Sequence, residues 1–164
     1  MFRTTIIAAS AAFLAMPALA CDGFSVEDAY VRTSTAMSTS GAAFMQMHNA
    51  GGADCRLTGA RTDVSAVTQL HTHQIDANGI ARMIEVEDGF ALPAGGSHAL
   101  ERGGDHLMLM GLSQPLTQGQ TVHVTFVFED GSEATAEVRV DNERQPAPMG
   151  GMGGMGGMTH APGN

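Results

Sequence analysis

Residues 103–112 read GGDHLMLMGL, and their alternation is the clearest fold signal in the chain. As a β-strand, this stretch places Leu107 and Leu109 on one face and His106, Met108 and Met110 on the other. The leucine face is typical of a hydrophobic core. The opposite face carries an imidazole and two thioethers in a row, which predicts either ordinary packing or a binding surface for a soft ligand.

Similar short runs, alternating or apolar, fill the body of the chain from about residue 23 to 141, separated by Gly, Asn and Asp. We expect strands at 24–32, 42–49, 55–62, 66–75, 80–87, 98–101, 105–111, 121–130 and 133–140. The sequences at 76–79 (DANG) and 130–131 (DG) are typical of hairpin turns. No segment of ten or more residues has a convincing helical period. The sequence therefore predicts an all-β protein, a two-sheet antiparallel β-sandwich with Greek-key connections.

The two ends of the chain differ from this body. Residues 1–20 combine an early cation, a short apolar run and an A-x-A cleavage site, which predicts a Sec-type secretory signal peptide. Lipidation of Cys21, which directly follows the cut, is the alternative, although Ala18 stands where a lipidation signal favours a larger aliphatic residue. We expect a folded domain at 21–144 and a disordered, Gly- and Met-rich tail at 145–164.

Charge and cysteine content narrow the range of possible functions further. Without Arg3, 7 of the 8 basic residues remain against 17 acidic ones, so the mature chain has a net charge of 7 − 17 = −10. This balance argues against nucleic acid or an anionic membrane surface as a partner. In an exported protein, Cys21 and Cys55 predict a disulfide worth about 3–4 kcal/mol, with a thiolate metal pair or redox couple as the alternative.

Imidazole and thioether groups recur where strand pairing can bring them together. His71 and Met83 flank the expected turn, and His106 and Met108 lie two residues apart on one strand face, about 7 Å along it. These neutral, soft donors suit Cu(I), and methionine keeps its donor where an oxidising compartment would consume cysteine. The four residues predict a His2Met2 copper site. His73 shares a face with His71 and could be a ligand, an outer-shell partner or a solvated group.

The remaining donors divide into packing residues and a repeat. Methionine in a core is more often gap filler, and a single strand histidine is more often at the surface or hydrogen-bonded. We interpret Met45, Met47, Met110, His48, His98 and His123 in this way. The tail repeats methionine every third residue and ends with a histidine, at Met149, Met152, Met155, Met158 and His160. It predicts a second copper-binding segment, with some Cu(II) at the histidine, or else a solubilising linker.

Two long stretches resemble a known family: AYVRTSTAMSTSGAAFMQMHNAG at 29–51, and the run from LHTHQIDANGIARM through LPAGGSHALERGGDHLMLMGL to FVFEDG at 70–131. They resemble the PCu(A)C family of periplasmic copper chaperones over about residues 24–141. The resemblance implies a cupredoxin-like β-sandwich that binds Cu(I) through His71, Met83, His106 and Met108. It also implies copper supply for the binuclear copper centre of cytochrome c oxidase, alongside Sco-type proteins. The common motif has one residue fewer between the first His and the first Met, so His71 and His73 both remain candidates.

The leading hypothesis is a monomeric periplasmic metallochaperone that is not an enzyme. It would release copper by ligand exchange to a Sco-type protein or an oxidase subunit. The main alternative is a copper buffering or resistance protein in which the tail binds most of the copper. A copper oxidase or reductase would want an open coordination position and nearby acid–base groups. A purely structural sandwich leaves the donor pattern unexplained.

Overall fold

The structure, a computed structural model, describes residues 21–145. The predicted signal peptide and all but the first residue of the predicted tail lie outside the described residues. Between residues 21 and 145 the chain forms strands and turns, and no helix there is long and apolar enough to cross a membrane.

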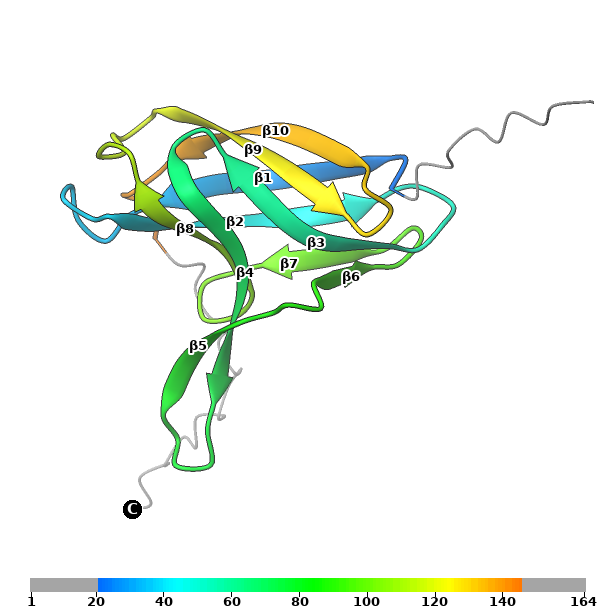
Figure 1. Cartoon of the computed structure of the whole chain (residues 1–164), viewed down its shortest axis with the longest axis horizontal. Coiled ribbons are helices and arrows are strands. Elements are labelled where there is room, and N and C mark those ends of the chain that lie inside the picture. The colour runs from blue at the N-terminus through cyan, green and yellow to red at the C-terminus, as the bar shows by residue number, and fades with distance from the viewer. Residues whose placement is uncertain (1–20, 146–164) are drawn as a thin grey trace, which may run out of the picture.

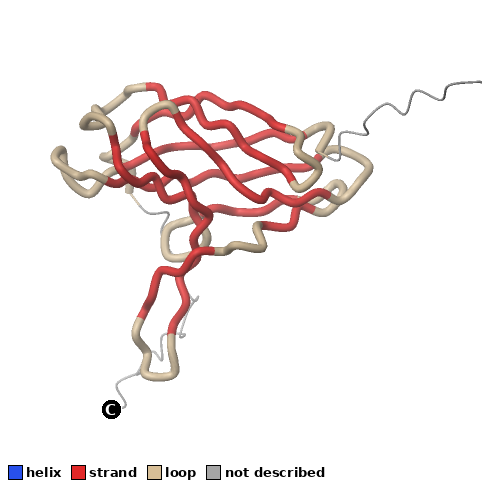
Figure 2. Tube along the Cα trace, viewed as in Figure 1, coloured by secondary structure: helices blue, strands red, loops and turns tan. Residues whose placement is uncertain are grey.

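Ten strands in the described part of the chain form one hydrogen-bonded sheet. They are β1 (Phe24–Arg32), β2 (Ser40–Asn49), β3 (Cys55–Thr62), β4 (Ser65–Ile75), β5 (Ala81–Glu85), β6 (Phe90–Leu92), β7 (Ser97–Leu100), β8 (His106–Leu112), β9 (Thr121–Phe128) and β10 (Glu133–Val140). The order is β5-β4-β8-β2-β1-β10-β9-β3-β6, and β7 also pairs with β2. The sheet curls over on itself around a core (Figures 1 and 2). The prediction of an all-β sandwich is confirmed, and the β1–β10 pair adds one parallel contact to the antiparallel ladder.

Local sequence explains several strand limits. The predicted strands at 24–32, 55–62 and 133–140 agree with the structure residue for residue. The β4–β5 turn forms because the Asp76 carboxylate accepts hydrogen bonds from the backbone N–H groups of Asn78 and Ile80, at 2.9 and 3.0 Å. Strand β6 was not predicted because three residues are too few to show an alternation.

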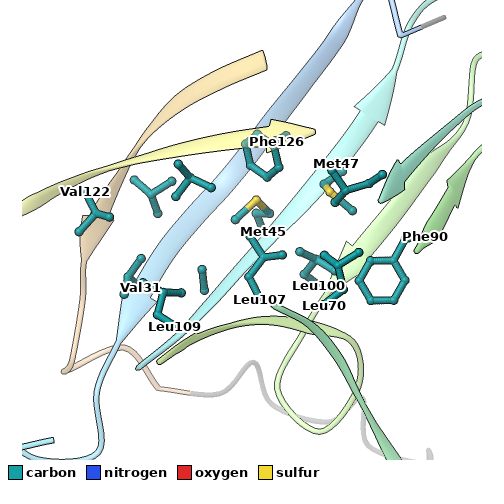
Figure 3. Close-up of a cluster of buried hydrophobic side chains, with 14 of the residues drawn as sticks. Val31, Met45, Met47, Leu70, Phe90, Leu100, Leu107, Leu109, Val122 and Phe126 are labelled. Atoms are coloured by element: carbon teal, nitrogen blue, oxygen red, sulfur yellow. The ribbon is translucent and has the colours of Figure 1, made fainter. Parts of the chain in front are cut away.

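The core lies on the inner face of the curled sheet, as the alternation predicts. Leu107 and Leu109 of β8 and Phe126 of β9 are fully buried. Met45 and Met47 of β2 pack among them, so their interpretation as core residues is confirmed (Figure 3).

Two strands, β7 and β8, pair one after the other with the same edge of strand β2. Strand β1 occupies one edge of β2, and on the other edge β7 pairs with Met45–His48 while β8 pairs with Ser40–Ala43. The loop 101–105 therefore leaves this edge after Leu100 and returns at His106, opposite Phe44. The outer half of β4 and all of β5 form a hairpin that projects away from the body of the sandwich (Figure 1).

Candidate metal site

Strand register places the four predicted donors on one face of the sheet. His71 on β4 is directly opposite His106 on β8, and Gln69 is opposite Met108. Residues that pair directly across strands, or lie two apart on one strand, point to the same side. Met83 on β5 is directly opposite His73, so it joins the same face one position further along the hairpin.

The opposite face confirms this assignment of sides. Leu70 and Leu107 form the neighbouring pair between β4 and β8, and they are 3% and 0% exposed in the core. The donors therefore lie on the outer face of β4, β5 and β8.

The imidazole rings lie close enough to share one ion. The ring centroids of His71 and His106 are 5.9 Å apart, and those of His73 and His106 are 5.2 Å apart. A metal–nitrogen bond of about 2.0 Å, plus about 1.1 Å from nitrogen to ring centre, keeps the centres of two rings on one ion within about 6.2 Å of each other. Both pairs meet this limit.

His106 is held in a form that leaves one nitrogen available. Its Nδ1–H donates to the carbonyl oxygen of Gly104 at 3.0 Å, so the lone pair remains on Nε2. The residue is 1% exposed, and burial lowers the pKa of its ring, which favours the neutral imidazole. The Nε2 atom is buried and has no hydrogen-bond partner. The Phe44 ring of β2 lies beside the His106 ring, with centroids 6.0 Å apart.

His71 shows the same pattern with its nitrogens exchanged. Its Nε2 lies 3.1 Å from the Gln69 side-chain oxygen and donates to it, while its Nδ1 is buried and unpartnered. His73 differs because its Nδ1 already faces the carbonyl oxygen of Gly104, at 3.4 Å. Two buried imidazole nitrogens on directly paired residues are thus left without a protein partner. Buried polar atoms in that condition are rare in folded proteins.

The two predicted thioether donors differ in exposure. Met108 is partly buried beside Gln69, whereas Met83 is 47% exposed on the hairpin. Among the described residues, no three His, Cys, Asp or Glu side chains converge into a metal site by themselves. The methionine sulfurs are further soft donors on this face.

Each of the other histidines lies beside an acidic neighbour. The shortest ring nitrogen to carboxylate distances are 3.5 Å for His48 with Glu27, 2.9 Å for His98 with Asp105 and 3.3 Å for His123 with Asp63. Met110 shares the outer face but lies opposite Val67, away from the imidazoles.

Cys21 and Cys55 form a disulfide with a Cα–Cα distance of 5.5 Å, so the described chain offers no free thiolate. The tail donors, Met149 to His160, lie outside the described residues.

Sequence reasoning did not identify three neighbours of the site. Phe44 lies beside His106, Gln69 accepts a hydrogen bond from His71, and Gly104 supplies the carbonyl that fixes the His106 ring. The pair of glycines at 103–104 signals a turn before β8, but not that its carbonyl would face the imidazole.

Fold and site together define a class of protein: a β-sandwich that presents neutral imidazole and thioether groups on the outer face of adjoining strands. A family model described as "Putative lipoprotein LpqE-like" matches residues 24–140. The chain therefore belongs to the LpqE-like family, and its resemblance to the PCu(A)C proteins is confirmed.

Individual relatives agree with this assignment. The curated protein "Putative lipoprotein Lxx21020" of Leifsonia xyli subsp. xyli is 38% identical over 124 residues, which is 76% of this chain and 73% of that one. The solution structure of Cu(I)-DR1885 from Deinococcus radiodurans is 33% identical, with a TM-score of 0.56, over 70% of this chain and 76% of that one. The copper-bound PCuAC domain of PmoF2 is 22% identical, with a TM-score of 0.59, over 75% of this chain and 96% of that one. This last likeness concerns the fold alone.

Proposed function

We propose that this chain is a copper metallochaperone that carries one Cu(I) ion on the outer face of β4, β5 and β8. The observation that carries the proposal is the pair of buried, unpartnered nitrogens, His71 Nδ1 and His106 Nε2, on directly paired residues. A buried polar group without a partner costs about 1–3 kcal/mol, and an ion between the two rings would recover that cost.

Thioethers complete the proposed donor set. Met108 follows His106 by two residues on the same face, and Met83 approaches from the hairpin. Two imidazoles and two thioethers are neutral and soft, which favours Cu(I) over hard divalent ions. The relative DR1885, whose solution structure contains Cu(I), supports this choice of ion.

We assign the second imidazole to His71 in preference to His73. The Nδ1 of His71 is buried and free, whereas the Nδ1 of His73 faces the Gly104 carbonyl. His73 then flanks the site, between His106 and the exposed Met83. This arrangement accommodates the extra residue in the turn, because register rather than sequence spacing decides which groups are neighbours.

The gradient of exposure across the site suggests how copper leaves. Met83 is 47% exposed on the hairpin, and His106 is 1% exposed beside Phe44. An acceptor would approach from the hairpin side, displace Met83 first and His106 last, and draw the ion away through stronger Cu–thiolate bonds. A carrier of this kind needs a surface site and no catalytic group.

The acceptor and the compartment follow from the family resemblance. We propose delivery in the periplasm, after Sec-type export, to a Sco-type protein or directly to a cytochrome c oxidase subunit. The lipoprotein name of the Leifsonia relative supports export. The disulfide supports it too, since such bonds persist in oxidising compartments.

A Cu(I) titration against a colorimetric chelator tests the site. The wild type should retain one tightly bound ion, and the His106→Ala, Met108→Ala double variant should lose it. The matched control is His123→Ala with Met110→Ala, which removes the same residue types outside the proposed ligand set. Undiminished affinity in the first variant, or an equal loss in the control, would overturn the assignment.

Deleting the tail distinguishes the chaperone function from the buffering function. Arg102 Nη1 donates to the backbone oxygen of Arg144 at 3.3 Å, so the chain leaves the described part beside the loop 101–105. We propose that the tail thioethers, attached at this point, act at a raised effective concentration near the site. Under the chaperone proposal, deleting residues 146–164 leaves the tight site of the body intact. Under a buffering function, the same deletion removes most of the bound copper, including any Cu(II) at His160.

A further inference from the structure

An imidazole outside the proposed ligand set is attached to the loop that leads into β8. His98, on β7, lies with its Nε2 2.9 Å from Asp105 Oδ2, and both side chains are about one quarter exposed. The His98 ring stacks on the buried Phe90 ring of β6, with centroids 4.7 Å apart and planes 22° apart. The His98 ring thus packs against Phe90 on one side and contacts the Asp105 carboxylate on the other.

The loop 101–105 is compact and closed by its own backbone. Glu101 N donates to Asp105 O at 2.8 Å, and Gly104 N donates to Glu101 O at 3.1 Å. Gly103 has a φ of +89°, a left-handed conformation that glycine adopts without a steric penalty. The two ends of the loop are registered on β2, and the His98–Asp105 pair holds its last residue.

Asp105 directly follows the residue whose carbonyl orients His106. The Gly104 carbonyl belongs to the peptide unit joining Gly104 to Asp105, so a rotation of the backbone at Asp105 moves this oxygen. That oxygen accepts the Nδ1–H of His106 at 3.0 Å. Its position therefore decides whether the ring carries its proton on Nδ1 and keeps the Nε2 lone pair free.

We propose that His98 and Asp105 form a positioning pair for the copper site. They hold the Gly104 carbonyl in place, and this carbonyl fixes the tautomer and orientation of His106. A group hydrogen-bonded directly to a metal-bound histidine typically changes metal affinity by about 10–100-fold when removed, and the His98–Asp105 pair acts through such a group, the Gly104 carbonyl. The affinity effect rests on the proposed copper function, whereas the tautomer is a property of the metal-free protein.

Three substitutions at one position test the pair. His98→Ala removes both stacking and hydrogen bond, His98→Phe keeps stacking on Phe90 without a donor, and His98→Gln restores an N–H that reaches Asp105. In metal-free protein, long-range ¹H–¹⁵N spectra should show His106 as the Nδ1–H tautomer in the wild type and His98→Gln. The Ala and Phe variants should show a mixture of tautomers.

Copper affinity supplies the second measurement. We expect one ion per chain throughout, bound about tenfold or more weakly in His98→Ala and His98→Phe and within about threefold of wild type in His98→Gln. His123→Ala is the matched control, because His123 also pairs with an aspartate, Asp63, in another part of the fold.

The outcomes separate this proposal from the copper function. A wild-type tautomer and affinity in the folded His98→Phe variant would overturn the positioning pair. A tautomer that depends on His98, in a protein that binds no Cu(I), would support the pair and refute the copper site.

Discussion

On β8, neighbouring residues have different roles because their side chains point to opposite faces of the sheet. Leu107 is fully buried in the core, whereas Met108, on the outer face, pairs in register with Gln69 beside the imidazoles. Met110 shares that outer face and is also partly buried, but its partners are Val67 and Ser40. The strand thus offers a thioether next to the proposed ion and a second thioether away from it.

Met108→Leu should weaken Cu(I) binding by at least tenfold, because leucine has no sulfur to donate. The same substitution at Met110 should leave affinity within about threefold. Both exchanges nearly conserve volume, so each should cost less than about 1.5 kcal/mol of unfolding free energy. Chelator competition and denaturant unfolding measure the two quantities. Equal affinities in the two variants would contradict the proposed role of Met108.

Leu107→Ala should show the reverse behaviour. Leu107 is 0% exposed, so its truncation leaves a cavity and should lower the free energy of unfolding by about 2–5 kcal/mol. Cu(I) affinity of the folded fraction should change little, since the side chain points away from the imidazoles. Calorimetry with and without copper distinguishes the two effects, and the bound ion should raise the melting temperature of the variant.

The β4–β5 hairpin shows what the sequence could and could not determine. Alternation identified the strands and their faces, and the DANG sequence predicted the turn between them. The sequence did not determine the register, because a period of two shows which face of the sheet a residue occupies but not which residue it pairs with on the next strand. The turn places Met83 opposite His73 and Glu85 opposite His71. The pairing of β8 with β4, which makes His71 and His106 neighbours, is a long-range contact with no local signal.

Acid should weaken the turn through Asp76. Backbone hydrogen bonds from Ile80 and Asn78 lower the pKa of this carboxyl below its ordinary value of 3.8. As pH falls through 3.8 towards the lowered folded pKa, the unfolded chain takes up the proton first, so the stabilisation present above 3.8 is lost. A carbon-detected titration should therefore place the Asp76 midpoint below 3.8.

The corresponding variant is Asp76→Ala. The difference in unfolding free energy between wild type and Asp76→Ala should be largest above about pH 5 and shrink in more acidic solution. Asp76→Asn serves as the control, because it keeps an acceptor oxygen in the turn without a titrating group. A difference that grows as pH falls would refute this explanation of the turn.

At the scale of the whole molecule, one continuous sheet separates the disulfide from the donors. Cys55 lies on β3, near one end of the strand order, and the donor face lies on β8, β4 and β5 at the other. The sequence predicted the all-β fold, since this depends on local alternation, whereas the donor set stays a prediction from residue chemistry. The curl of the sheet and the parallel β1–β10 contact depend on packing between distant segments, which no local pattern reveals.

Replacing both cysteines, as Cys21→Ser with Cys55→Ser, should lower the free energy of unfolding by about 3–4 kcal/mol. This figure follows from the sequence separation of 34 residues and the chain entropy that the bond removes from the unfolded state. Denaturant unfolding under oxidising and reducing conditions measures it. Cu(I) affinity of the folded double variant should match wild type, and a parallel loss of affinity would show that disulfide and metal site are coupled.

The way β7 and β8 share one edge of β2 has an evolutionary consequence. Each strand is aligned on β2 by its own hydrogen bonds, so residues can be gained or lost between positions 101 and 105 without shifting either alignment. Natural selection can therefore vary the surroundings of His106 through insertions and deletions while the leucines beneath stay in place. Such a segment lets related carriers diversify their metal preference or docking partner on an unchanged scaffold.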